Sequence, residues 1–131
     1  MAIGYNGPAS KQGAAGMYSV DRSVVIVKPK EPFLEWIRNL PGSGIDITLE
    51  QLRADSTVYL IPDFDEIEDA LEAIDHIYGK IFEAELAEWS EEEVTWPQER
   101  TLKHFWQWFD VTLHSLVIDA AEEVMGEIRM N

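Results

Sequence analysis

The chain has 131 residues, of which 46% are hydrophobic and 11% aromatic, and this composition is typical of one folded domain. It contains no cysteine, which excludes disulfides, thiolate-bound zinc and cysteine nucleophiles, and no apolar run approaches the roughly 20 residues that span a bilayer. The net charge of −15 lies entirely in residues 61–131, which hold 4 basic and 19 acidic side chains, whereas residues 1–60 hold six of each. Such a field disfavours direct binding to nucleic acids and to anionic membranes.

The first 20 residues contain four of the eight glycines, one proline and a single charged side chain. They have no apolar stretch, so they do not resemble a signal peptide. Segments of this composition at a chain end are typically without a packed core. We therefore expect a flexible arm over residues 1–20 and a single globular domain over residues 21–131.

The domain opens with a predicted short strand over residues 22–28. Its run Val24-Val25-Ile26-Val27 would place β-branched side chains on both faces of the strand. An apolar run of this length is typical of a strand that is buried on both faces. Residues 31–40 then carry apolar side chains at helical spacing, with Pro32 in the first turn. The turn formers at residues 41–44 predict the end of that helix.

Thr48 and Gln51 have the spacing of a capping box, in which each side chain bonds the backbone N–H of the other residue. They predict a short helix that ends near Asp55. Residues 57–61 form the second predicted strand, and Pro62 closes it. Because helical segments connect the first two strands, we consider a parallel arrangement of the two.

A long amphipathic helix is predicted from the carboxylates at residues 63–66 to about Trp89. Acidic side chains favour the first turn of a helix because they face the positive end of its dipole. Apolar side chains recur with a period of 3.6 residues, and Gly79 is the weak point within the segment. These apolar residues are Ile67, Ala70, Leu71, Ile74, Ile77, Tyr78, Ile81, Phe82 and Trp89.

The last third of the chain predicts a helix, a strand and a final short helix. A charged loop at residues 90–93 precedes a helix that we expect to open at Thr95. Residues 111–118 form the third predicted strand, and Asp119 is placed to cap the last helix. The apolar sides of these two helices are Leu102, Phe105, Trp106 and Phe109 for the first and Ala121, Val124, Met125 and Ile128 for the second.

The predicted elements follow the order β-α-α-β-α-α-β-α. Three strands are too few for a closed barrel, so the pattern indicates a small three-stranded sheet packed with helices. The fold class expected from the sequence is therefore α/β or α+β, in a single domain.

The acidic helix is the strongest functional candidate in the sequence. Residues 63–99 contain 14 acidic side chains and only one basic side chain, Lys80. Carboxylates at this density repel one another, and a face of this kind favours a basic protein partner, although a solvated helix face has the same pattern. The candidate partner-binding carboxylates are Glu68, Asp69, Glu72, Asp75, Glu85 and Glu88.

Five tryptophans are many for a chain of this length, and three of them lie near or beside the acidic segment. Trp89 and Trp96 flank the charged loop, and Trp108 lies at the edge of an apolar helix side. Tryptophan often anchors interfaces because it combines a large apolar area with one hydrogen-bond donor. These three residues are predicted to contribute to partner binding or, alternatively, to a structural homodimer.

A small enzyme that depends on a divalent metal is the alternative function. Asp63 and Asp65 follow the second strand, His114 lies in the third strand, and Asp119 follows it. Carboxylate oxygens and an imidazole are suitable metal ligands, and strand ends are common ligand sites. The phosphate-binding glycine motifs and the Gly-x-Ser-x-Gly nucleophile motif are absent, so the leading expectation is a protein that is not an enzyme and needs no cofactor.

Several short motifs resemble those of a group of small acidic bacterial proteins to which no activity is assigned. The resemblance covers roughly residues 22–120 and implies a bacterial, cytoplasmic protein without implying catalytic residues. The motifs are Tyr59-Leu60-Ile61-Pro62, Trp96-Pro97, Arg100, Phe105, Trp108-Phe109, His114-Ser115 and Asp119.

Overall fold

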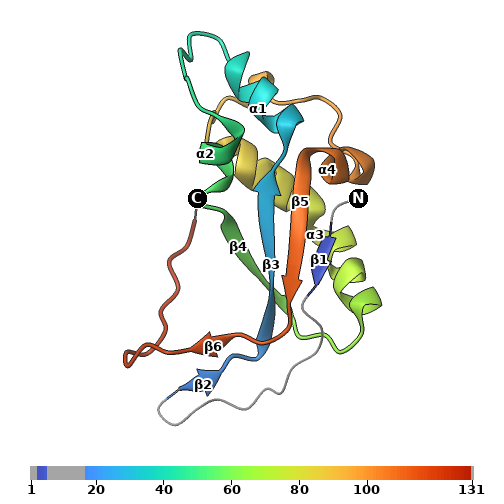
Figure 1. Ribbon diagram of the computed structural model, residues 1–131, viewed down its shortest axis with the longest axis vertical. Coiled ribbons are helices and arrows are strands. Elements are labelled where there is room, and N and C mark those ends of the chain that lie inside the picture. Colours follow the sequence, from blue (N-terminus) through green and yellow to red (C-terminus); the bar gives the residue numbers. More distant parts are fainter. Residues whose placement is uncertain (1–2, 6–16, 131) are drawn as a thin grey trace.

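The fold is α+β, with four α-helices and a small, mainly antiparallel sheet (Figure 1). The structure is a computed structural model that describes residues 3–5 and 17–130 of the chain. The main sheet has the strand order β1-β5-β3-β4, and strands β2 and β6 form a separate ribbon of two strands. The predicted three strands are therefore present, and a short strand at the N-terminus extends their sheet.

Strand β3 (Arg22–Pro29) is central in the sheet, in keeping with its continuous apolar run. It pairs antiparallel with β4 (Thr57–Pro62) on one side and with β5 (Phe109–His114) on the other. Strand β1 (Ile3–Tyr5) joins the far side of β5 in a parallel pairing.

The parallel arrangement of the first two strands is wrong, because the helices between them do not cross a face of the sheet. Helices α1 (Glu31–Arg38) and α2 (Leu49–Arg53) instead lie at one end of the sheet, so the chain turns back into β4 (Figure 1). Arg53 holds α2 in this position through a hydrogen bond of 2.9 Å to the carbonyl of Pro29 and an ion pair of 2.7 Å with Asp110.

The predicted capping box is confirmed at the start of α2. The Gln51 backbone N–H donates to Thr48 Oγ1 at 3.1 Å, and the Thr48 backbone N–H donates to Gln51 Oε1 at 2.9 Å. These two bonds satisfy donors that the first turn of a helix otherwise leaves free.

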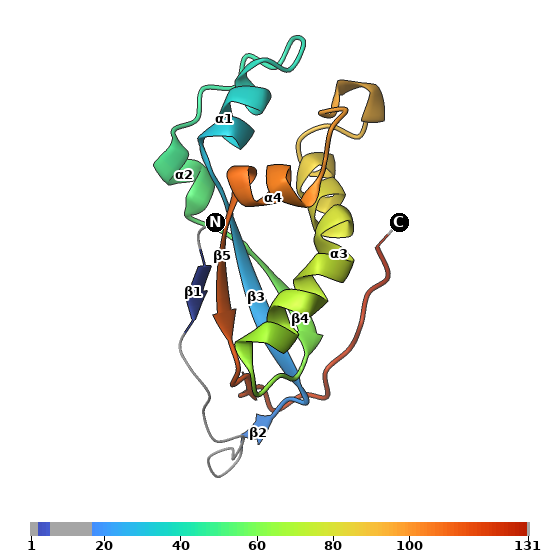
Figure 2. The ribbon, with the colours of Figure 1, turned by 90° about the vertical axis from the view of Figure 1, so that its right-hand side faces the viewer.

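Helices α3 (Ile67–Ala87) and α4 (Leu102–Trp108) cover one face of the sheet and enclose the core (Figure 2). The sheet faces this core with alternate residues, such as Val25 and Val27 of β3, while four phenylalanines fill the space beneath the helices. The largest fully buried side chains of the core are Phe33, Phe82, Phe105 and Phe109. None of the helices in the described part of the chain is both long and apolar enough to cross a bilayer.

Parts of the expected N-terminal arm are strands in the structure. Ile3–Tyr5 forms β1, and Tyr18–Ser19 forms β2, which pairs antiparallel with β6 (Ile118–Asp119). The expectation of an irregular arm is wrong for these residues because they find backbone partners from the last third of the chain, which local composition does not reveal. Residues 1–2 and 6–16 of that arm lie outside the described residues.

The helix expected from Thr95 onward begins later. A single 3-10 turn at Glu93–Thr95 is followed by Pro97, and α4 starts only after Thr101, whose side chain accepts the His104 backbone N–H at 3.2 Å. The helix also ends before Phe109, which is the first residue of β5. Thr101 is the better start because its hydroxyl satisfies a free N–H of the first turn.

The helix expected after Asp119 is absent, and residues 120–130 form no regular structure in the described chain. Asp119 Oδ1 accepts the backbone N–H of Ala121 at 3.0 Å, so the predicted cap forms only a local turn. A segment this short is marginal as a helix unless its apolar side packs on another surface. Here Val124 and Ile128 are almost fully exposed, and Gly126 weakens the helix further.

Candidate functional site: carboxylates around Trp89

The first half of α3 presents an exposed acidic stripe. Glu68, Glu72 and Asp75 are spaced three or four residues apart and therefore lie on one side of the helix, with Asp69 beside them. Among the residues that the structure describes, none of these four carboxylates forms an ion pair. The stripe is therefore a surface of largely uncompensated negative charge.

Two other carboxylates of the acidic segment do have basic neighbours. Glu83 accepts from Arg100 at 3.4 Å, and Glu99 lies 3.6 Å from a ring nitrogen of His104. Arg100 also lies over the ring of Trp96, with its guanidinium carbon 5.6 Å from the ring centroid. These contacts fix the loop between α3 and α4.

Glu85 is not part of the exposed face, which corrects the expectation from the sequence. Glu85 is only 8% exposed, and its Oε2 accepts a hydrogen bond of 2.5 Å from the hydroxyl group of Tyr59. Burial raises the pKa of Glu85, and nearby Glu88 raises it further, although the bond from Tyr59 acts in the opposite direction. The pKa of Tyr59 is raised as well, by burial and by the neighbouring Glu85.

A small hollow of about 80 Å³ lies beside this pair, where the end of α3 meets the start of β4. Asp55, Glu85 and Glu88 line it on the acidic side, and Trp89 contributes an aromatic wall. In the described residues these three carboxylates have no basic side chain in ion-pair contact. A small acidic and aromatic hollow of this kind suits the end of a lysine or arginine side chain.

A second hollow, of about 190 Å³, is also lined by Trp89. The acidic loop lines it with Ser90 and Glu92, and the loop after α1 lines it with Pro41 and Ile45. The loop after α1 turns sharply at Gly42 and Gly44, whose φ values of 66° and 54° are rarely adopted by other residues. Trp89 is half-buried and lines both hollows, each of which also has at least one carboxylate in its lining.

Trp96 and Trp108 belong to the packing of the domain, whereas the sequence predicts that they contribute to partner binding or to a homodimer. Trp96 is 8% exposed, and its Nε1 donates to the carbonyl of Ser90 at 2.8 Å. Trp108 is half-buried, and its ring centroid lies 6.0 Å from Phe33 and 5.5 Å from Phe82. Of the three tryptophans singled out in the sequence, Trp89 is the one that borders these hollows.

The four candidate metal ligands do not form a metal site. No three acidic or histidine side chains of the described residues are close enough to hold a metal ion. Asp63 Oδ1 accepts a hydrogen bond of 3.1 Å from Ser23 Oγ, and Asp119 caps its local turn. His114 pairs with Val24 on the face of the sheet away from the helices, and Asp65 is exposed.

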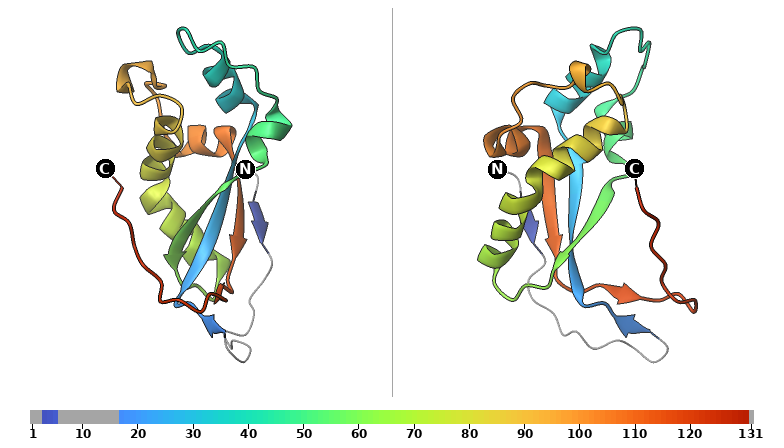
Figure 3. Two further views of the ribbon diagram at one scale, coloured as in Figure 1. Left: turned by 90° about the vertical axis from the view of Figure 1, so that its left-hand side faces the viewer. Right: turned by 180° about the vertical axis from the view of Figure 1, so that it is seen from behind.

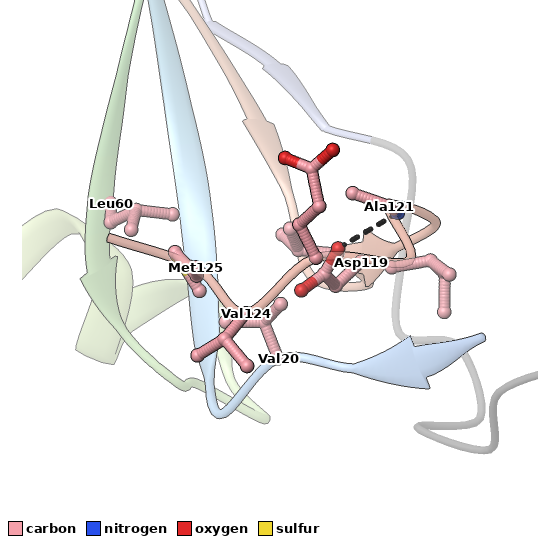
Figure 4. Close-up of a pocket in the computed structure, with 9 residues that line it drawn as sticks. Val20, Leu60, Asp119, Ala121, Val124 and Met125 are labelled. Carbon is pink, nitrogen blue, oxygen red and sulfur yellow. Dashed lines mark hydrogen bonds between the residues drawn. The ribbon is translucent and has the colours of Figure 1, made fainter. Parts of the chain in front are cut away.

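A third hollow, of about 320 Å³, is apolar and lies at the opposite end of β4 (Figure 4). Leu60 of β4 lines it from the sheet, and Val20, Val124 and Met125 line it from the segments next to β2 and β6. The fold thus places an acidic hollow near the first residue of β4 and an apolar hollow near its far end.

Sequence reasoning missed Asp55, Tyr59 and Glu92 as members of the site. The signal for Asp55 is its position between a capped helix and a strand, which places it at the end of the sheet. The pairing of Tyr59 with Glu85 has no signal in the sequence, because it depends on the direction in which α3 crosses β4. Comparisons of the chain with protein-family models, with curated proteins and with solved structures gave no match.

Proposed function

We propose that this protein is an acidic interaction module that binds a basic protein partner through the carboxylates around Trp89. One observation carries the proposal: half-buried Trp89 lines two hollows, one with Asp55, Glu85 and Glu88 and the other with Glu92. A lysine or arginine in either hollow gains charge-assisted hydrogen bonds and a favourable contact with the ring face. It also compensates carboxylates that lack a basic neighbour in the described chain.

The exposed stripe on α3 has a different part in this proposal. Its residues lie toward the start of a helix of 21 residues, whereas Glu85 and Trp89 lie at or just beyond the other end. At the usual rise of about 1.5 Å per residue, the two regions are roughly 15 Å apart at their nearest residues and about 30 Å apart at their farthest. The stripe therefore acts through the long-range field, which speeds the approach of a basic partner at low salt.

The proposal assigns the protein to the bacterial cytoplasm and to protein partners. Nucleic acids and anionic membranes are unfavourable ligands because the same carboxylates repel phosphate groups. A metal-dependent enzyme is disfavoured, since no three acidic or histidine side chains of the described residues are grouped so as to hold a metal ion. A homodimer built on Trp89, Trp96 and Trp108 is also disfavoured, because Trp96 and Trp108 pack within one copy.

A short, fluorescently labelled oligolysine peptide tests the proposal. The variant Glu88→Gln with Glu92→Gln removes one carboxylate from each hollow, and the control Glu122→Gln with Glu127→Gln removes the same charge from the exposed C-terminal segment. The first pair should weaken binding by about tenfold at low salt, and the control by less than about twofold. Fluorescence anisotropy measures both affinities.

Equal losses in the two double variants would contradict the proposal, because binding would then follow net charge alone. Affinity that stays unchanged from low to high salt would also contradict it, since contacts between exposed charges weaken as salt rises. Circular dichroism of both variants checks that the comparison is made between folded proteins.

A further inference from the structure

Strand β4 has an unprotected outer edge. Within residues 3–5 and 17–130 it pairs only with β3, so one side of its backbone has no strand partner. All six of its residues are uncharged, and Val58 and Leu60 are 54% and 53% exposed. Natural proteins commonly protect such edges with charged side chains, bulges or prolines, and within β4 only Pro62 at the end of the strand is a residue of these types.

We propose that the basic partner docks as an extended segment that adds a strand to the free edge of β4. This inference rests on the proposed function and specifies the form of the partner. Backbone hydrogen bonds to β4 would supply affinity, and the alternating side chains of the added strand would supply specificity.

The charges around β4 select a basic strand as the occupant. Asp55 precedes the strand, Asp63 follows it, and Glu85 and Glu88 lie beside its first residues. A second copy paired antiparallel along the same edge would place Asp55 of one copy near Asp63 of the other, which is unfavourable. The chain's own segment at residues 120–130 is also disfavoured, because it carries three glutamates and one arginine.

The two faces of β4 define the side chains of the added strand. Thr57 and Tyr59 face α3, and the acidic hollow beside Thr57 is placed to receive a lysine or arginine. Val58 and Leu60 face the opposite side, where the sheet has no covering helix (Figure 3). The apolar hollow that includes Leu60 extends this side with Val124 and Met125 (Figure 4). The segment should therefore alternate basic and apolar residues.

A short peptide of alternating lysine and valine is the probe, and its affinity is measured by calorimetry. A second peptide of the same sequence has alternate amides N-methylated, which keeps every charge but blocks hydrogen bonds along one edge. The variant Val58→Lys with Leu60→Lys adds charge on β4, and the control Ile128→Lys with Met130→Lys adds the same charge at two apolar residues that are more exposed and lie outside β4. Amide hydrogen exchange of β4 is followed with and without the probe.

The proposal expects binding of the unmodified peptide, with slower exchange of the β4 amides that do not pair with β3. It expects a loss of at least about tenfold from N-methylation and from the β4 variant, and a loss of less than about twofold from the control. Binding that responds to Glu88→Gln with Glu92→Gln but not to N-methylation or to the β4 variant would overturn strand addition and leave the proposed function intact. A failure of all these variants to change affinity would overturn both.

Two further outcomes would assign β4 to another occupant and so overturn the inference. Sedimentation that shows a dimer dissociated by the β4 variant would assign the edge to a second copy. Slow exchange of every β4 amide without peptide, at a concentration where the protein is monomeric, would show that the chain itself covers the edge.

Discussion

Replacement of Phe82 by alanine should lower the free energy of unfolding by about 3–5 kcal/mol, the usual loss for a buried phenylalanine. Phe82 has no exposed area, and its ring centroid lies 5.2 Å from Phe109, 5.5 Å from Trp108 and 6.4 Å from Phe105. The side chain thus joins α3 to α4 and to the first residue of β5. The loss includes both the buried apolar area and the cavity that remains when three aromatic rings cannot close over it.

Urea unfolding followed by circular dichroism measures this change. Val94→Ala is the control, because Val94 is 83% exposed and its truncation should change stability by less than about 0.5 kcal/mol. Since domains of this size have total stabilities of roughly 5–15 kcal/mol, the Phe82 variant should also melt at a clearly lower temperature. A loss below about 2 kcal/mol would contradict the central position of Phe82 in the core.

Glu85→Gln should raise the free energy of unfolding at neutral pH by about 1–2 kcal/mol, the range in which unfavourable polar burial is measured in proteins. Burial raises the pKa of Glu85 in the folded state above that of an unfolded glutamate, about 4.3. Below that lower value both states hold the proton, so the stabilisation by the protonated carboxyl is fully present. As the pH rises through the raised pKa of the folded state, this stabilisation is lost. Glutamine cannot ionise, and its side-chain oxygen still accepts the hydrogen bond from Tyr59.

The test compares urea unfolding of Glu85→Gln and the natural chain between pH 4 and pH 8, a range that starts near the ordinary pKa of a glutamate. The stability gained by the variant should grow with pH. Glu68→Gln serves as the matched control, because Glu68 is exposed near the other end of the same helix and its replacement should change stability by less than about 0.5 kcal/mol. A gain that is constant across this range, or a loss at neutral pH, would mean that the ionised Glu85 is well compensated in the fold.

Local patterns in the sequence predicted the elements that local interactions stabilise. The capping box of Thr48 and Gln51 starts α2, and the 3.6-residue period of apolar side chains marks α3, whose bounds Ile67–Ala87 lie inside the expected segment. The apolar run of residues 24–27 likewise indicated a strand buried on both faces, and in β3 the side chains of Val24, Val25 and Val27 are buried. Each of these signals is contained within a few adjacent turns or residues.

Other features depend on contacts between distant parts of the chain. Strands β1, β2 and β6 have two or three residues each and exist through pairing alone. Composition therefore indicated an arm in place of β1 and β2, and it placed Ile118 of β6 at the end of a longer third strand. The periodic segment after Asp119 looks like a helix, yet Val124 and Ile128 on its apolar side remain almost fully exposed. Local sequence signals do not contain these partners.

The candidate site was predictable in part for the same reason. Its acidic character and the importance of Trp89 follow from composition and spacing. The burial of Glu85 does not follow from the sequence, because it depends on which element packs against that side of α3. In the structure this element is β4, and Tyr59 of β4 bonds Glu85. Trp96 similarly turns inward because Pro97 and the 3-10 turn redirect the chain.

The position of β3 between β4 and β5 has a consequence for the way the chain folds as it is synthesised. Strand β4 follows β3 after two short helices, but β5 is made only after α3 and α4. Until Phe109–His114 has left the ribosome, one edge of β3 and its run of four β-branched residues remain open to other chains. Completion of the sheet therefore depends on late contacts between remote segments, a topology that folds slowly and benefits from chaperones that shield the nascent chain.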